Sequence, residues 1–332
     1  MTMWPRRRRQ RPPRRLCPEL DDGQLARTLT HLKAQIAAQG DNLAESNDRG
    51  ALTYPIEQAL RDPGDDWDRR MHRLLVLSTI PEALVLARQW RSRDPAGADA
   101  LLLQIFAGIH RARAAGTALD IDATVRLCRH AGALAPKDPA PWIAMLSCRR
   151  MQRAPGAVVQ PVWDAIKERD RWNREAHRQM LHYVSPHECG SSALTVQFLD
   201  SVTIAAPPGA PVAALSLTHS LTRYRRALTA GGIEALTAHR HWNQPHERAL
   251  VDQALATWPQ PGFLTHAAAL ADLNLLACVL TKATRLPDAW PVLEAMSGVA
   301  TAWPWELDGD PLQQVQEAHR RALRARSRQT SR

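Results

Sequence analysis

Proline and glycine divide the chain after Asp65 into segments of about 12 to 20 residues, with apolar residues at the spacing of a helix. Only a few residues separate neighbouring segments, so consecutive helices are expected to pack as pairs joined by short turns. The strongest breaks are Asp94-Pro95, residues 137–139, residues 154–156, Ser185-Pro186 and residues 206–209.

The amino-acid composition favours helices over sheets. The chain has only 3 Phe and 3 Tyr, and Ala, Leu and Arg, which form helices well, dominate it. A chain of 332 residues exceeds the length at which one hydrophobic core is comfortable, whereas a stacked array of helices needs no single large core. We therefore predict an all-α protein in which helix-turn-helix pairs stack into an α-solenoid.

The first ordered helix is expected over residues 21–39. Its leucines and isoleucine stand four, three and four residues apart, and Gly40 would end it. The polar stretch from residue 41 to about residue 55 is expected to be a loop, and residues 62–65 mark another break. Further along, Asp120 or Asp122 could cap a helix, and another helix is expected to start at Ser191 or Ser192. The apolar residues of the first helix are Leu25, Leu29, Leu32 and Ile36.

Four regions follow from these patterns. Residues 1–18 contain arginine and proline with almost nothing to bury, so they are expected to be a disordered tail. Residues 19–232 are predicted to form a helical repeat domain, and residues 233–319 a C-terminal helical region. Residues 320–332 are expected to be a basic tail that frays.

An internal period supports the stacking of helix pairs. Residues 135–142 are echoed 34 residues later by residues 169–176, and 34 residues is the length of a tetratricopeptide repeat. A later segment resembles that repeat more clearly, because small residues stand where two helices would cross closely, and residues 284–288 supply the turn. The positions that carry this resemblance are Leu276, Ala277, Leu280, Ala289 and Leu293.

The resemblance covers about half of the chain. Leu146 stands where a small residue is expected, and residues 233–263 fit no repeat. Three short segments are also similar to an uncharacterised group of actinobacterial helical proteins, namely residues 173–177, residues 189–191 and residues 303–311. Both resemblances imply a helical fold, and the second implies no activity.

The positive charge is concentrated at the two ends of the sequence. The formal net charge is +10, but seven arginines lie in residues 1–15 and six in residues 320–332, and neither segment contains an acid. The chain between them has slightly more acids than bases. The arginine-rich tails therefore suggest an alternative function, in which a helical regulator contacts nucleic acid electrostatically.

Cysteine and apolar residues indicate a cytoplasmic protein without a membrane span. The 5 cysteines are scattered singly, with no Cys-x-x-Cys pair for zinc or redox chemistry, so reduced thiols are expected. No apolar stretch approaches the roughly 18 to 20 residues needed to cross a bilayer. We expect a cytoplasmic location and no membrane partner.

Two clusters of metal-ligand residues could form chemical sites, and the first contains His177, His182, His187 and Cys189. His177 and His182 are five residues apart, or about 140° around a helix, which does not suit two metal ligands on one helix. A second cluster, residues 239–247, contains three histidines and Glu247 around Trp242, and leaves open an enzyme with an unrecognised site. We predict no metal and no cofactor, because no phosphate loop, dinucleotide fingerprint or nucleophile elbow occurs.

The leading hypothesis is a non-catalytic scaffold that binds a peptide or a partner helix on a concave helical surface. The chain contains 11 Trp, and aromatic and arginine side chains are typical anchors of binding surfaces. The groove residues would come from the first helix of each pair. The candidates are Trp142, Arg149, Arg178, Tyr183 and Asn274.

Overall fold

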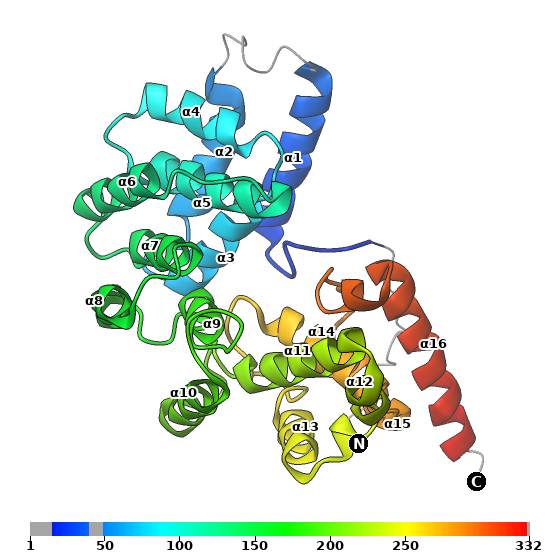
Figure 1. The fold of residues 1–332 in the computed structure, drawn as a ribbon. Coiled ribbons are helices and arrows are strands. Elements are labelled where there is room, and N and C mark those ends of the chain that lie inside the picture. Colours follow the sequence, from blue (N-terminus) through cyan, green and yellow to red (C-terminus); the bar gives the residue numbers. More distant parts are fainter. Residues whose placement is uncertain (1–14, 40–48, 331–332) are drawn as a thin grey trace. The chain divides into compact units, whose positions relative to one another are not determined.

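The computed structural model describes residues 15–39 and 49–330 (Figure 1). These residues form sixteen α-helices and short 3₁₀ turns, and their only extended pairing is a single bridge between Leu16 and Ala300. The all-α prediction is confirmed. None of the described helices combines the length and the apolarity needed to cross a membrane.

The chain divides into two compact units. The N-terminal unit is Asp22–Ala206, and the C-terminal unit contains the described residues 15–21 and 207–330. The division falls at the Pro207-Pro208 break, whereas the sequence suggested a boundary between residues 232 and 233. The difference arises because residues 215–230 form a helix that packs on later helices of the C-terminal unit.

Ten helices make up the N-terminal unit, and most consecutive helices pack against one another in chain order (Figure 1). In addition, α3, α5, α7 and α9 pack on each other in succession. The bounds are α1 (Gly23–Gln39), α2 (Arg49–Arg61), α3 (Trp67–Ser78), α4 (Ala83–Arg93), α5 (Ala98–Ala115), α6 (Ile121–Leu134), α7 (Ala140–Met151), α8 (Gly156–Arg169), α9 (Arg174–Tyr183) and α10 (Ser192–Ala205).

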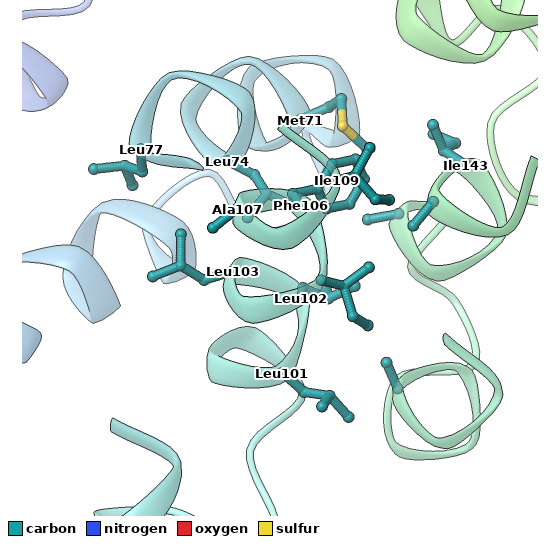
Figure 2. Close-up of a cluster of buried hydrophobic side chains, with 14 of the residues drawn as sticks. Met71, Leu74, Leu77, Leu101, Leu102, Leu103, Phe106, Ala107, Ile109 and Ile143 are labelled. Atoms are coloured by element: carbon teal, nitrogen blue, oxygen red, sulfur yellow. The ribbon is translucent and has the colours of Figure 1, made fainter. Parts of the chain in front are cut away.

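The core of the N-terminal unit is centred on α5. Figure 2 shows its apolar side chains between those of α3 and Ile143 of α7. Because α5 is covered on several sides, it carries apolar residues around most of its circumference, as expected for an internal helix. Each fully buried leucine contributes about 2 kcal/mol to folding. The labelled residues of α3 and α5 are Met71, Leu74, Leu77, Leu101, Leu102, Leu103, Phe106, Ala107 and Ile109.

Two buried arginines of α3 connect it to distant parts of the unit. Arg70 donates to Asp138, which lies before α7, with an Nη2–Oδ2 distance of 2.9 Å. Arg73 donates through Nε to Oδ2 of Asp22, before α1, over 2.6 Å. A buried guanidinium without such a partner would be strongly destabilising. These two pairs therefore fix the starts of α7 and α1 against α3.

Polar caps begin several helices. Asp120 caps α6 by accepting from the Ala123 amide over 2.9 Å, and Ser191 caps α10 by accepting from the Leu194 amide over 3.1 Å. Both are among the caps expected from the sequence. Asp22 caps α1, which extends to Gln39, the last described residue before the gap.

The loop predicted from residue 41 to about residue 55 is wrong for its second half. Residues 49–55 belong to α2, which contains Pro55 in its interior. Proline normally breaks a helix, but burial of Leu52, Ile56 and Leu60 on one face of α2 offsets its cost. Residues 40–48 lie outside the described residues.

The C-terminal unit is built around α14. Six consecutive residues, 275–280, are completely buried where α14 packs on α13, α15 and α11. Ala277 and Ala289, the small residues noted in the sequence, are both 0% exposed where α14 packs on α15. The bounds are α11 (Leu215–Ala230), α12 (Gly232–Ala238), α13 (Pro245–Thr257), α14 (Ala269–Lys282), α15 (Leu286–Ala295) and α16 (Pro311–Thr330).

Both predicted tails contain ordered residues. Near the start, the Cys17 amide donates to the Ala300 carbonyl over 2.7 Å, and Cys17 is buried. At the other end, α16 continues to Thr330, because its buried face is held by packing on α15. The tail assignments of residues 15–18 and 320–330 are therefore corrected, while residues 1–14 and 331–332 lie outside the described residues.

Candidate partner-binding face

The C-terminal ends of α5 and α7 meet α9 and the turn that follows it in a cluster of charged side chains, here called the charged face. The helix ends come together because α5, α7 and α9 pack in succession. Arg178 and His182 are exposed one turn apart on α9. The charged face consists of Arg113, Arg150, Glu175, Arg178, Gln179, His182 and Glu188.

Most of these side chains are joined by hydrogen bonds. Arg150 donates through Nε to Glu188 Oε2 over 2.8 Å, and a second contact to Oε1 makes the pair bidentate. Arg150 also donates to Gln179, which in turn donates to Glu175. Arg178 completes the chain by donating to Glu175 Oε2 over 3.0 Å. Bidentate arginine pairs are strong and directional, so Arg150 is held in one orientation.

Arg113 differs from the other two arginines of the charged face. The residue is exposed, and its guanidinium makes no hydrogen bond or ion pair with any described residue, although the charges of Glu175 and Glu188 lie near it. Partial burial and the neighbouring charge of Arg150 lower the pKa of Arg113, although an arginine remains charged at neutral pH. The charged face therefore has three guanidinium charges against two carboxylates, and the unpaired one belongs to an exposed residue.

His182 adds no charge to this balance near neutral pH. Although the residue is exposed, partial desolvation of its ring, together with the charges of Arg150 and Arg178, lowers the pKa of His182 to about 4. Its imidazole is therefore neutral at pH 7 and can donate or accept a hydrogen bond. The excess positive charge of the charged face resides on arginine alone.

The turns beside the charged face are braced against each other. Tyr183 donates through its hydroxyl to the Ala154 carbonyl over 2.8 Å, and Arg153 donates to the His187 carbonyl over 2.9 Å. Gly190 lies against Val184, because a Cβ on Gly190 would come within 1.9 Å of the Val184 carbonyl oxygen. The close approach fixes the turn that carries Glu188.

Three of the residues predicted from the sequence lie in this region, with different roles. Arg178 is part of the charged face. Tyr183 is partly buried and its hydroxyl is used in the brace to Ala154. Arg149 is adjacent to Arg150 but donates to Gln152 over 2.7 Å, within its own helix end.

Trp142 lies at the opposite end of α7 and serves packing. Its ring occupies the space left by Gly132 of α6, where a Cβ would lie 3.5 Å from the indole. The guanidinium of Arg169 covers the ring at 4.9 Å from its centroid. These contacts leave Trp142 partly buried within the helix stack, away from the charged face.

Asn274 cannot belong to a partner-binding surface in this fold. The residue is 0% exposed in the C-terminal unit. Its Oδ1 accepts from Trp305 Nε1 over 2.9 Å, and its Nδ2 donates to the Leu270 carbonyl over 2.8 Å and to the Val299 carbonyl over 3.1 Å. Asn274 thus holds the segment after α15 onto α14, and the prediction for this residue is corrected.

Sequence reasoning missed Arg113, Arg150 and Glu188. The two arginines stand in the last turns of α5 and α7, where basic residues also complement the helix dipole. Nothing local distinguishes them from other arginines of the chain. Their role depends on which acidic residues the fold brings close to them. Glu188, the partner of Arg150, is 38 residues away in the sequence.

The cluster at residues 239–247 does form a polar site, but one that is buried. His241 Nε2 lies 2.9 Å from Ser220 Oγ, and Ser220 also donates to Glu247. In a nucleophilic triad the histidine stands between the serine and the acid, whereas here the serine stands between them. His239 and His246 are exposed and contribute nothing to it. The arrangement links α11 to α13 and leaves Ser220 without solvent access.

The histidines of α9 do not converge either. His177 is buried against Trp163, with ring centroids 4.9 Å apart, and stacks on Trp172. His182 is exposed on the charged face. Across residues 15–39 and 49–330, no group of three or more His, Cys, Asp and Glu side chains is arranged to hold a metal ion.

Comparisons with known proteins find no matching family model, no matching curated protein and no matching solved structure.

Proposed function

We propose that the N-terminal unit is a protein-interaction module of the tetratricopeptide-like, α-solenoid type, and that its charged face binds an acidic segment of a partner protein. The succession of α3, α5, α7 and α9, with α4 and α6 each packed on both of their neighbours, supports a repeat architecture. The 34-residue offset between the starts of α7 and α9 agrees with that repeat length.

The observation that carries the proposal is the unpaired guanidinium of Arg113. Arg150 and Arg178 already have carboxylate partners, whereas Arg113 has none among the described residues and is exposed. A carboxylate from a partner would neutralise the excess charge and relieve the repulsion from Arg150. Arginine binds carboxylates in bidentate geometry, so an aspartate or glutamate side chain is the expected group.

The surroundings of Arg113 favour a peptide over a small molecule. The charged face is spread over three helix ends and a turn, and the nearby Arg178 and His182 offer further exposed donors. The Arg150–Glu188 pair is preformed, so little side-chain ordering is needed on binding. An extended acidic segment could contact Arg113 and Arg178 together.

A random peptide library selected on the full-length protein tests the proposal. We expect the enriched peptides to be rich in Asp and Glu, and their affinity to fall with rising salt. Loss of one charged hydrogen-bond partner costs about 1.5 to 3 kcal/mol, so Arg113→Gln should weaken the best peptide by about tenfold or more.

Arg111→Gln is the matched control. Arg111 is exposed on the same helix, two residues away and on another side of it. Its substitution removes the same charge, so it should leave the affinity within about twofold. Enrichment of peptides without acids, or equal weakening by the two substitutions, would contradict the proposal.

A further inference from the structure

The outer side of α16 carries a row of exposed arginines, here called the arginine ridge and defined as Arg320, Arg321, Arg324 and Arg328. The opposite side of the helix is apolar and buried against α15, at Val315, Ala318 and Ala322. Packing therefore fixes which side of α16 faces solvent. The basic side is the outer one.

The arginine ridge is largely unneutralised. Arg320 pairs with Glu317 over 2.7 Å, but Arg321, Arg324 and Arg328 make no hydrogen bond or ion pair with described residues. The sequence contains no acid after Glu317. Arg326 is not part of the arginine ridge, because it covers the Trp290 ring and lies near Glu294.

Stabilisation of the helix end does not account for this row. A basic residue favours the C-terminal end of a helix only within its last turn. Of the four arginines, Arg328 alone stands in the last turn of α16, and the other three lie further back. Their exposure also excludes a role in the core.

The spacing of the row suits a regular array of negative charges. Arg320, Arg324 and Arg328 follow one another at four-residue intervals, so they line one side of the helix about 6 Å apart along its axis. A duplex presents closely spaced phosphates along each strand in a fixed geometry. A rigid helix can therefore place several guanidiniums on phosphates without ordering a flexible tail.

We infer that the arginine ridge of α16 binds duplex DNA through its phosphate backbone. A membrane surface fits less well, because the apolar side that would enter the bilayer is already buried on α15. Single-stranded nucleic acid is usually held by exposed aromatic rings, and the arginine ridge has none. The inference is independent of the charged face, which belongs to the other unit.

The beginning of the sequence also supports DNA binding by the C-terminal unit. Residues 15–21 belong to the same compact unit as α16, through the contacts of Leu16 and Cys17 with Ala300. The seven arginines of residues 1–15 are therefore attached to the unit that carries the arginine ridge. Both arginine-rich segments of the sequence therefore adjoin described residues of one unit.

Fluorescence anisotropy of a labelled 20-base-pair duplex, titrated with the full-length protein at about 50 to 200 mM salt, tests the inference. In the first variant, Arg320, Arg321, Arg324 and Arg328 are all replaced by Gln. Each lost phosphate contact lowers the slope of log affinity against log salt by about 0.9, so we expect a decrease of about 3 to 4. Affinity should fall at least about tenfold at the lowest salt.

A control variant replaces Arg88, Arg111, Arg126 and Arg129 by Gln. These arginines are exposed in the N-terminal unit, so the change in total charge is the same. Circular dichroism checks that both proteins remain helical. A milder variant carries only Arg324→Gln and Arg328→Gln, and its slope of log affinity against log salt should decrease by about half as much. This variant keeps the test valid if the fourfold variant misfolds.

DNA binding that depends on the arginine ridge and survives both the control substitutions and removal of residues 1–14 would support the inference. It would be overturned by a wild-type protein that does not bind the duplex, or by equal weakening in both fourfold variants. Tighter binding to a single strand would also overturn it. So would binding to phosphatidylserine vesicles in place of DNA.

Discussion

His177 lies in an environment very different from that of a free side chain in water. Its ring lies between Trp163 and Trp172, and its Nδ1 is 2.9 Å from the Asn173 carbonyl oxygen. Burial lowers the pKa of His177 to about 4, from an ordinary value of 6.5. The folded chain therefore keeps this imidazole neutral at pH values where an unfolded chain protonates it.

A pH dependence of stability follows for His177. Above about pH 6.5 the neutral ring is present in both states and its full contribution is retained. As pH falls from 6.5 towards 4, only the unfolded chain binds the proton, so stability declines by about 1.4 kcal/mol per pH unit. Urea denaturation at pH 7 and pH 5 should show a smaller loss for His177→Phe than for the wild type. An unchanged loss would contradict this account, and the exposed His130→Phe serves as the control.

Single residues also show that the sequence alone does not predict which polar side chains are buried. Arg70 looks like any surface arginine of a helix, yet it is buried on Asp138, 68 residues away. The repeat pattern predicts Asn274 on a groove surface, whereas its side-chain amide donates to the carbonyl of Leu270 in α14 and to that of Val299 after α15. Burial of a polar side chain depends on partners that local patterns do not reveal.

At the level of helices and turns, the sequence was more informative. Proline, glycine and capping residues act on the neighbouring backbone, so breaks such as residues 137–139 and the cap at Asp120 could be predicted. The helix α2 was missed because packing of its apolar side outweighs Pro55. Local signals thus located turns better than they located the helices that tertiary contacts stabilise.

Two glycines provide a matched test of the turn and of the helix packing. An added Cβ at Gly190 would lie 1.9 Å from the Val184 carbonyl oxygen, whereas at Gly132 it would make an ordinary 3.5 Å contact with the Trp142 ring. Gly190→Ala should therefore destabilise the protein by about 2 to 4 kcal/mol. Gly132→Ala should be neutral or stabilising by up to about 1 kcal/mol, because alanine favours the helix.

Thermal and urea denaturation of the two variants measure this difference. If Gly190→Ala were as stable as the wild type, the turn after α9 would not be fixed as described. A large loss for Gly132→Ala would show that α6 and α7 are closer at Trp142 than the structure has them.

For the whole molecule, the division of the chain was predicted less well than the class of its fold. The helical repeat pattern extended the first domain to residue 232, whereas the compact unit ends at Ala206. The C-terminal unit also includes residues 15–21, and no local pattern shows that the start of a chain packs beside Ala300. Contacts between distant segments decide these boundaries.

The two units carry different basic surfaces. The charged face of the N-terminal unit has one unpaired guanidinium beside a preformed ion-pair network, which suits an acidic peptide. The arginine ridge of the C-terminal unit has a row of exposed charges, which suits a polyanion. We therefore propose a protein that recognises a partner protein through one unit and DNA through the other.

Hydrogen exchange of the full-length protein, measured by mass spectrometry with and without the selected acidic peptide, tests the central claim most directly. The account predicts slower exchange in the last turns of α5, in α9 and in the turn that contains Glu188, and no such change in Arg113→Gln at the same peptide concentration. Slower exchange confined to the C-terminal unit, or the same protection in Arg113→Gln, would contradict it.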